Sequence, residues 1–343
     1  MSNPLLLSRR SFMVMPLALA ACKQGWSVLE LSGLTMGTGY SIAAVDHSNK
    51  IDKADLQSAI DIALARVNTQ MSNWDKSSEI SRFNASSSGD SMTVSPQLAR
   101  VMQAAADVHD ASAGAFDVTV GPLIDLWGFG AEGTRNDMPA DSDIADAMAC
   151  CGQAQSVALR GNTLHKLNGG AEVYLSSIGK GYGIDEVART LASFGLNDYM
   201  VDIGGDLYTA GRNPEGKPWQ IGIETPKSFD RGVLKVVGLS DMGMATSGDY
   251  RNYFNVDGQR YSHIIDATTG RPVTHDTTSV SVMAENAMMA DAWATALLVL
   301  GREKGLEIAR EHDLAALFID RDVKDPTSGF KTTATERFTA LTA

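Results

Sequence analysis

Hydrophobic residues recur with two different spacings along the chain. Apolar positions three to four residues apart predict helices over residues 53–71, 96–111 and 178–194, the last of which stops at Gly195. A strongly apolar segment, residues 288–300, predicts another helix that Gly301 ends, and residues 303–311 predict a further one. The helices therefore account for much of the apolar patterning.

Shorter segments carry the pattern of strands. Apolar and polar residues alternate around residues 39–45, and residues 157–159 and 163–167 flank Gly161-Asn162, which is typical of a hairpin. Further strands are predicted at residues 219–224, 233–237 and 279–283. There is neither a regular alternation of strand and helix nor an internal repeat. We therefore expect a single α+β domain over residues 23–343, with interleaved mixed or antiparallel sheets and helices.

Residues 1–22 have the features of an export signal. Arg9 and Arg10 lie in a segment that resembles a twin-arginine signal, and the apolar residues 12–21 that follow are fewer than the ~20 needed to span a membrane. Residues 19–22 resemble a lipobox, in which Cys22 would be lipidated; cleavage by an ordinary signal peptidase is the alternative. The sequence predicts a periplasmic protein, with membrane contact only through a lipid at Cys22.

Composition and charge restrict the ligands. With 44% apolar and 20% charged residues the chain has an ordinary globular composition, and its formal net charge is −12. An acidic surface disfavours nucleic acid, because phosphate backbones recruit basic patches. A bound phosphate would need local donors instead: backbone amides, a well-placed lysine or a divalent cation.

Asp291 and Thr295 are four residues apart on a predicted helix that starts near Asn286. A carboxylate and a hydroxyl so placed leave one face of the helix and can share a hard cation. Mg²⁺ needs few protein oxygens when substrate phosphates complete its coordination, so one further ligand would suffice. On spacing alone, a capping Asp and a packing Thr are the commoner interpretation.

Two other segments bear polar groups. Residues 174–185 are predicted to lead from a strand into a helix through small residues, where backbone amides and Lys180 could hold a phosphate. The glycine spacing excludes a P-loop, and a tight turn explains the glycines equally well. His263 is predicted to point off a strand and could take a proton from a hydroxyl, although a lone histidine is more often structural.

Aromatic residues follow a further candidate segment. Residues 115–123 contain Asp117 between apolar neighbours, and Trp127 and Phe129 come soon after. Aromatic faces could stack on a flat ring, but packing in the core is the commoner role.

Taken together, these segments resemble the ApbE family, the FAD:protein FMN transferases (flavinyltransferases). The resemblance begins at residues 36–42, continues through residues 71–74 and 78–84, and reaches the helix that carries Asp291. It implies a fold related to the T-fold. It also implies Mg²⁺-dependent cleavage of FAD between its phosphates, transfer of FMN to a Ser or Thr hydroxyl of a target redox protein, and release of AMP.

The resemblance assigns roles to individual residues. His263 matches the histidine proposed as the base. The implied metal ligands are Ser177, through its backbone carbonyl, Asp291 and Thr295. The implied FAD-contacting positions are Met36, Trp74, Ala115, Phe116, Asp117, Tyr174, Lys180 and Ile265. Tyr174 is a departure, because the family commonly has Asp there.

The implied acceptors are exported or membrane-bound redox proteins, such as subunits of Rnf- or Nqr-type sodium-pumping complexes or the regulator of nitrous oxide reduction. Two alternatives share the same site: a periplasmic FAD pyrophosphatase that yields FMN and AMP, and a non-enzymatic flavin-binding lipoprotein. The non-enzymatic alternative predicts lost ligands, whereas Asp291, Thr295 and His263 are all present.

Overall fold

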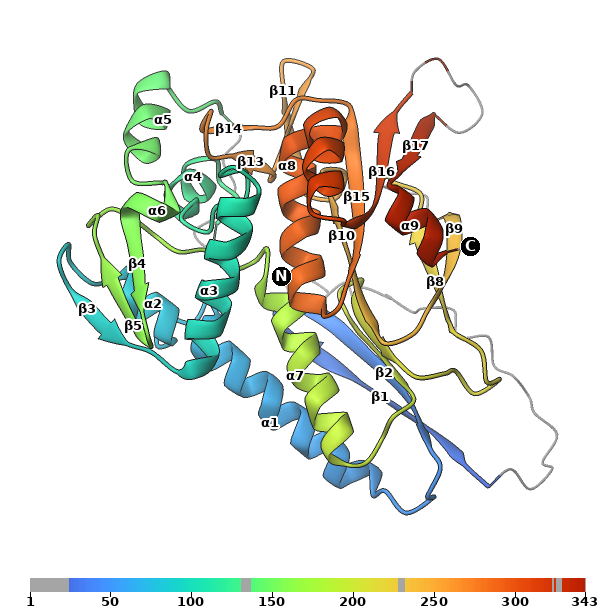
Figure 1. Cartoon of the computed structure of the whole chain (residues 1–343). Helices are drawn as coiled ribbons and strands as arrows, with labels where there is room; N and C mark the ends of the chain where they lie inside the picture. Colours follow the sequence, from blue (N-terminus) through green and yellow to red (C-terminus); the bar gives the residue numbers. More distant parts are fainter. Residues whose placement is uncertain (1–24, 131–136, 228–231, 323, 325–328, 343) are drawn as a thin grey trace, which may run out of the picture.

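The structure is a computed structural model and describes residues 25–130, 137–227, 232–322, 324 and 329–342. The predicted export signal and Cys22 lie outside these residues. The described part forms a single α+β domain, which confirms the predicted fold class (Figure 1). Among these residues, every helix is too short or too polar to cross a membrane.

The helices are α1 (Lys53–Met71), α2 (Glu79–Asn84), α3 (Pro96–Ala111), α4 (Gly121–Leu126), α5 (Asp141–Met148), α6 (Gln153–Ser156), α7 (Gly179–Ser193), α8 (Ala287–Glu311) and α9 (Glu336–Leu341). The strands of the main sheet are β1 (Ser27–Thr35), β2 (Thr38–Asp46), β6 (Tyr199–Ile203), β7 (Asp206–Ala210), β10 (Met242–Gly248), β15 (Thr277–Ala284), β16 (Ala315–Arg321) and β17 (Phe330–Ala334). The shorter strands are β3 (Ser91–Thr93), β4 (Val157–Arg160), β5 (Thr163–Lys166), β8 (Trp219–Glu224), β9 (Val233–Leu239), β11 (Tyr253–Val256), β12 (Gln259–Ser262), β13 (Ile265–Asp266) and β14 (Arg271–Pro272).

The main sheet has eight strands in the order β1-β2-β6-β7-β10-β15-β16-β17, and each neighbouring pair is antiparallel. Both of its faces are covered. Alternate residues of β16 show this, since Phe318 packs in the core beneath α3 and α8, whereas Leu317 and Ile319 pack in the core that includes β8, β9 and α9. Such double burial explains why β15 is buried along its whole length.

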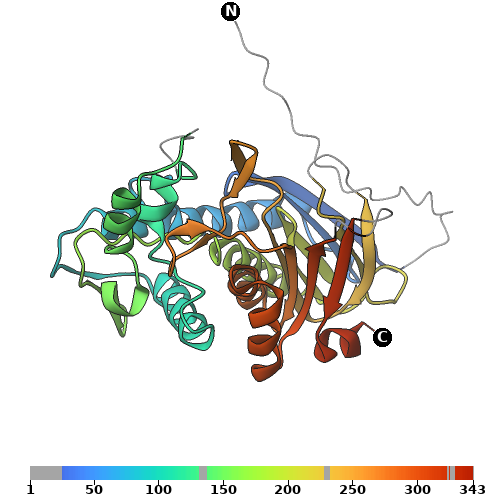
Figure 2. The same cartoon turned by 90° about the horizontal axis from the view of Figure 1, so that it is seen from above.

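Helices α1, α7 and α8 lie against one face of this sheet, and the β8–β9 hairpin with α9 covers the other (Figures 1 and 2). A smaller group of elements, α2 to α6 with the sheet β3-β5-β4, stands to one side of α8. The predicted hairpin is confirmed here, because β4 pairs with β5 and Gly161 takes a left-handed conformation in the turn.

Close packing of α7 on α8 determines where the later site residues lie. A Cβ at Gly181 would come within 2.2 Å of the Ala287 carbonyl oxygen, so only glycine allows this approach. Gly301, with φ of +69°, interrupts α8 between the two helices that the sequence predicts.

Asp185 of α7 caps the start of α8. Its carboxylate accepts hydrogen bonds from the amides of Ala287 (2.9 Å) and Met288 (3.1 Å), and burial raises its pKa to about 6. Replacing Asp185 with alanine leaves two buried amides without acceptors, so we expect the free energy of unfolding to fall by about 2–4 kcal/mol in urea titrations. Asp185→Asn keeps one acceptor oxygen, so its free energy of unfolding should fall by less than that of Asp185→Ala. An equal fall in both variants would contradict the capping role.

Candidate functional site

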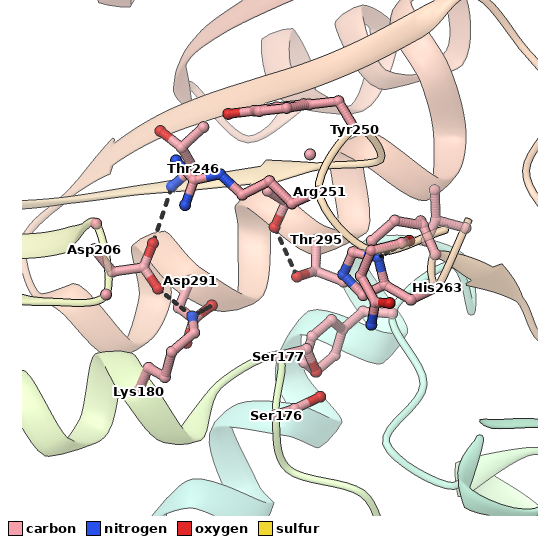
Figure 3. Close-up of a pocket in the computed structure, with 18 of the residues that line it drawn as sticks. Ser176, Ser177, Lys180, Asp206, Thr246, Tyr250, Arg251, His263, Asp291 and Thr295 are labelled. Carbon is pink, nitrogen blue, oxygen red and sulfur yellow. Dashed lines mark hydrogen bonds and ion pairs between the residues drawn. The ribbon is translucent and has the colours of Figure 1, made fainter. Parts of the chain in front are cut away.

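A cavity of about 450 Å³ opens where the start of α7, the β6–β7 turn, the end of β10 and the middle of α8 meet (Figure 3). Chain segments far apart in sequence thus converge on one space. The predicted site residues that line it are Trp74, Ala115, Phe116, Asp117, Tyr174, Ser177, Lys180, His263, Ile265, Asp291 and Thr295. Met36 is the exception among the predicted residues.

Lys180 lies between two buried carboxylates. Its ammonium pairs with Asp206, and with Asp291 at 3.3 Å, while the amide of Gly181 donates to the other oxygen of Asp291 at 3.0 Å (Figure 3). The second oxygen of Asp206 accepts from the amide of Thr246 at 3.1 Å. These bonds join α7, α8, the β6–β7 turn and β10 around one charged cluster.

Burial and charge act in opposite directions on this cluster. Burial would lower the pKa of Lys180, but Asp206 and Asp291 outweigh it and raise that pKa, so the ammonium persists at neutral pH. Burial raises the pKa of Asp291 to about 6, although Lys180 opposes the shift. A second cation near Asp291 would favour its ionised form further.

The oxygen atoms at the site suit a hard cation. Asp291 and Thr295 lie one turn apart on α8, and the Thr295 hydroxyl is 3.0 Å from that of Ser247 on β10. Ser177 lines the cavity from the residues before α7. No group of three or more His, Cys, Asp or Glu side chains that could hold a metal exists among the described residues. Mg²⁺ often takes only one or two carboxylates, with hydroxyl, carbonyl and substrate oxygens completing its shell, so the residues present fit it.

His263 has a defined tautomer. Its Nδ1 lies 3.1 Å from the carbonyl oxygen of Asn252, which can only accept, so Nδ1 carries the hydrogen and Nε2 keeps a free lone pair. Burial lowers the pKa of His263 below 6.5, which favours the neutral ring. The sequence predicted that His263 would point off a strand, but it follows β12 by one residue, where its backbone amide also donates to Asn252.

Trp74 and Asp117 also line the cavity, but they differ in how many hydrogen bonds hold their side chains. Trp74 is 60% exposed and contacts Tyr174 edge to face at 5.6 Å between ring centroids. Asp117 is already bonded, because it accepts from the amide and hydroxyl of Thr119 and from the amide of Gln153 at 2.6–3.0 Å. An open aromatic face therefore borders the cavity, whereas Asp117 holds its own turn together.

One prediction about this part of the chain needs correction, and one predicted residue lies outside the cavity lining. Tyr174 does not end a strand, since pairing in its segment is limited to an isolated bridge between Glu172 and Val120. Met36 does not line the cavity; it lies in the β1–β2 turn with φ of +48°, and its methyl group covers Gly183 of α7. Its predicted contact with FAD stays a prediction.

Several lining residues were not predicted, above all Asp206. It follows Gly204-Gly205 after an apolar strand, a turn that places a carboxylate at the strand end beside Lys180. The sequence gives no direct signal of this contact, because Lys180 and Asp206 meet only through the pairing of α7 with the sheet. Thr246, Ser247 and Tyr250 also line the cavity, from the end of β10 and the residues that follow it.

Comparison with known proteins identifies the arrangement. The sequence model of the ApbE family matches residues 36–318. The chain belongs to the ApbE family. An FAD:protein FMN transferase of Vibrio cholerae is 43% identical over 322 residues, which cover 94% of this chain and 95% of that protein. One of Escherichia coli is 38% identical over 86% of this chain and 85% of that protein.

Solved structures agree with the family assignment. The flavin transferase ApbE of Vibrio cholerae superposes with a TM-score of 0.85 at 41% identity, covering 92% of this chain and 99% of its own. The flavinyl transferase ApbE of Pseudomonas stutzeri gives 0.83 at 37% identity, covering 92% and 97%. The predicted family, the α+β fold and the assignment as an enzyme are confirmed.

Proposed function

We propose that this ApbE-family enzyme transfers FMN from FAD to a Ser or Thr hydroxyl of a target redox protein and releases AMP, with Mg²⁺ as cofactor. The observation that carries the proposal is the convergence of Lys180, Asp291, Thr295 and His263 on one cavity beside an exposed aromatic face. The relatives named as FAD:protein FMN transferases support the same reaction.

The reaction exchanges the phosphoanhydride bond of FAD for a phosphoester bond to the acceptor. The acceptor hydroxyl attacks the phosphorus of the FMN half, the new P–O bond forms, and the bond to the oxygen of AMP breaks. Nε2 of His263 takes the hydroxyl proton, since Nδ1 is committed to Asn252. Lys180 stabilises negative charge on the phosphate oxygens, and Asp206 holds its ammonium in place.

Asp291, Thr295 and the Ser177 carbonyl would hold Mg²⁺. When bound, the ion supplies Lewis-acid stabilisation of charge on the pyrophosphate. The chain itself contributes preorganisation, because Asp291 is fixed by the Gly181 amide and Thr295 by Ser247 before any ligand enters.

Tyr174 changes how the adenosine end of FAD is recognised. Burial, with the nearby charge of Asp125, raises the Tyr174 pKa to about 12, so the phenol stays protonated. A phenol can donate a hydrogen bond, whereas the aspartate common in the family can only accept when ionised. The aromatic pair of Trp74 and Tyr174 adds a surface for a flat ring.

The alternative reaction is hydrolysis, in which water replaces the acceptor hydroxyl at the same site. The two reactions are separated by following FAD, FMN and AMP chromatographically with Mg²⁺, with and without candidate acceptor proteins. Transfer predicts that AMP release requires an acceptor. Equal production of FMN and AMP without any acceptor would instead establish a pyrophosphatase.

The setting that we propose for the reaction is the periplasm, after export by the twin-arginine route and with a lipid anchor at Cys22. The motif around Arg9 and Arg10 supports export. Rnf- or Nqr-type subunits and the regulator of nitrous oxide reduction are the acceptors to test first.

The pH profile of transfer should report His263. Its neutral form is the base, so activity is lost as pH falls through its pKa, which burial places below 6.5. We therefore expect the acidic limb of kcat/KM to have its midpoint below 6.5. At saturating Mg²⁺, which favours the ionised form of Asp291, the limb should vanish in His263→Gln; an unchanged limb in that variant would assign it to another group.

A further inference from the structure

Asp249 is a buried carboxylate that the reaction does not use. It follows β10 directly, and both of its oxygens accept from the guanidinium of Arg321, at 2.6 and 2.7 Å. The Thr278 hydroxyl donates to it at 2.6 Å and Arg260 at 3.1 Å. One side chain thus connects the end of β10 to β15, β16 and β12.

This network holds the segment that orients the catalytic histidine. The amide of Asp249 bonds to the Thr278 carbonyl at 3.0 Å, so residue 249 is fixed through both backbone and side chain. Three residues later, the Asn252 carbonyl accepts from the backbone amide and from Nδ1 of His263. Arg260, from β12, also lies 4.1 Å above the Tyr253 ring, so the segment is held on both sides of Asn252.

The Asn252 carbonyl has a chemical consequence for the ring. While it accepts from Nδ1, Nε2 is free to take a proton. If the carbonyl moved away, the ring could adopt the other tautomer, in which Nε2 carries a hydrogen and cannot act as base.

We propose that Asp249 is a positioning residue for His263: by binding Arg321, Thr278 and Arg260 it fixes the Asn252 carbonyl, which sets the orientation and tautomer of the ring. The proposal rests on His263 being the base of the proposed function. It concerns a carboxylate that itself lies outside the cavity lining.

Asp320, which precedes Arg321 in the sequence, provides a matched control. Asp320 of β16 is buried, accepts from the Thr277 hydroxyl at 2.6 Å and pairs with Nε of Arg302 at 2.5 Å. It therefore repeats the grouping of Asp, Thr and Arg, with Thr277 on β15, Asp320 on β16 and Arg302 on α8. Neither Asp320 nor its two partners line the catalytic cavity.

The test compares Asp249→Asn with Asp320→Asn in the full chain. Flavin transfer is measured at saturating FAD and acceptor, FAD affinity is measured separately, and the His263 tautomer is read from the ¹⁵N resonances of histidine-labelled protein, assigned with His263→Gln. We expect Asp249→Asn to lower kcat about tenfold or more and to shift Nε2 toward its protonated form, with FAD affinity unchanged. Asp320→Asn should leave both readouts as in the wild type.

Arg321→Met provides a second variant if Asp249→Asn does not fold, since it leaves Asp249 held by Thr278 and Arg260. The proposal is overturned if a folded Asp249 or Arg321 variant keeps the wild-type tautomer and kcat, or if Asp320→Asn loses as much. If the wild-type protein transfers no flavin, the proposed function is refuted instead. The tautomer measurement would still show whether Asp249 sets the state of the His263 ring.

Discussion

Asp291→Asn is expected to reduce flavin transfer on the order of a thousandfold or more while leaving the protein folded. The substitution removes the negative charge that the proposed Mg²⁺ site would need, and charge stabilisation of this kind contributes several kcal/mol, with each ~1.4 kcal/mol worth a factor of ten in rate. The asparagine oxygen can still accept from the Gly181 amide, so the α7–α8 contact survives. The measurement is single-turnover transfer across a Mg²⁺ titration.

The control for this prediction is the dependence of transfer activity on the Mg²⁺ concentration. Wild-type activity should disappear with chelator and return on adding Mg²⁺, whereas Asp291→Asn should need far more Mg²⁺ or show no recovery. Thr295→Val tests the second ligand and should have a smaller effect, because a neutral hydroxyl contributes less than a carboxylate. An Asp291→Asn variant with wild-type rate and wild-type Mg²⁺ dependence would remove Asp291 from the metal site.

His263→Gln should lower kcat by roughly 10²–10⁴-fold, the usual contribution of a general base, with little change in FAD affinity. Glutamine approximates the size of the ring but cannot take the proton. The variant is measured by transfer kinetics and by FAD binding in parallel.

His275→Gln is the matched control, because this ring also contacts a backbone carbonyl, that of Val299 at 3.3 Å, but does not line the catalytic cavity. We expect near wild-type kcat from it. If both variants lost activity to the same degree, the loss would reflect packing rather than proton transfer.

Local patterns predicted the helices well. The spacing of residues 53–71 and 96–111 reproduces α1 and α3 to the residue, since each begins at a capping residue, Asp52 or Ser95, and buries one apolar face. The predicted end of the apolar helix at Gly301 is also confirmed, because this glycine adopts a positive φ that interrupts α8.

The sheet was predicted only in part, for a physical reason. Strands β6, β7 and β16 are buried on both faces, so they lack the alternation that marks a half-exposed strand. Their antiparallel order depends on long-range pairing that no local pattern encodes. The order of the strands in the sheet therefore came from the structure.

The same limit applies to the site. Asp291, Thr295 and His263 were ambiguous from spacing alone, and their meaning comes from the cavity that they share. Asp206 and Asp249 could not be assigned from sequence, because their partners, Lys180 and Arg321, lie 26 and 72 residues away and meet them only in the folded sheet. Met36, which the resemblance places at the flavin, packs its methyl group against Gly183 of α7 and lies outside the cavity lining.

We expect this site to transfer FMN onto a protein hydroxyl. The most direct measurement is mass spectrometry of an acceptor protein after incubation with the enzyme, FAD and Mg²⁺, followed by peptide mapping of the modified residue. We expect a mass increase equal to FMN minus water, located on one Ser or Thr and absent with the Asp291→Asn enzyme. An unmodified acceptor accompanied by free FMN and AMP would contradict it.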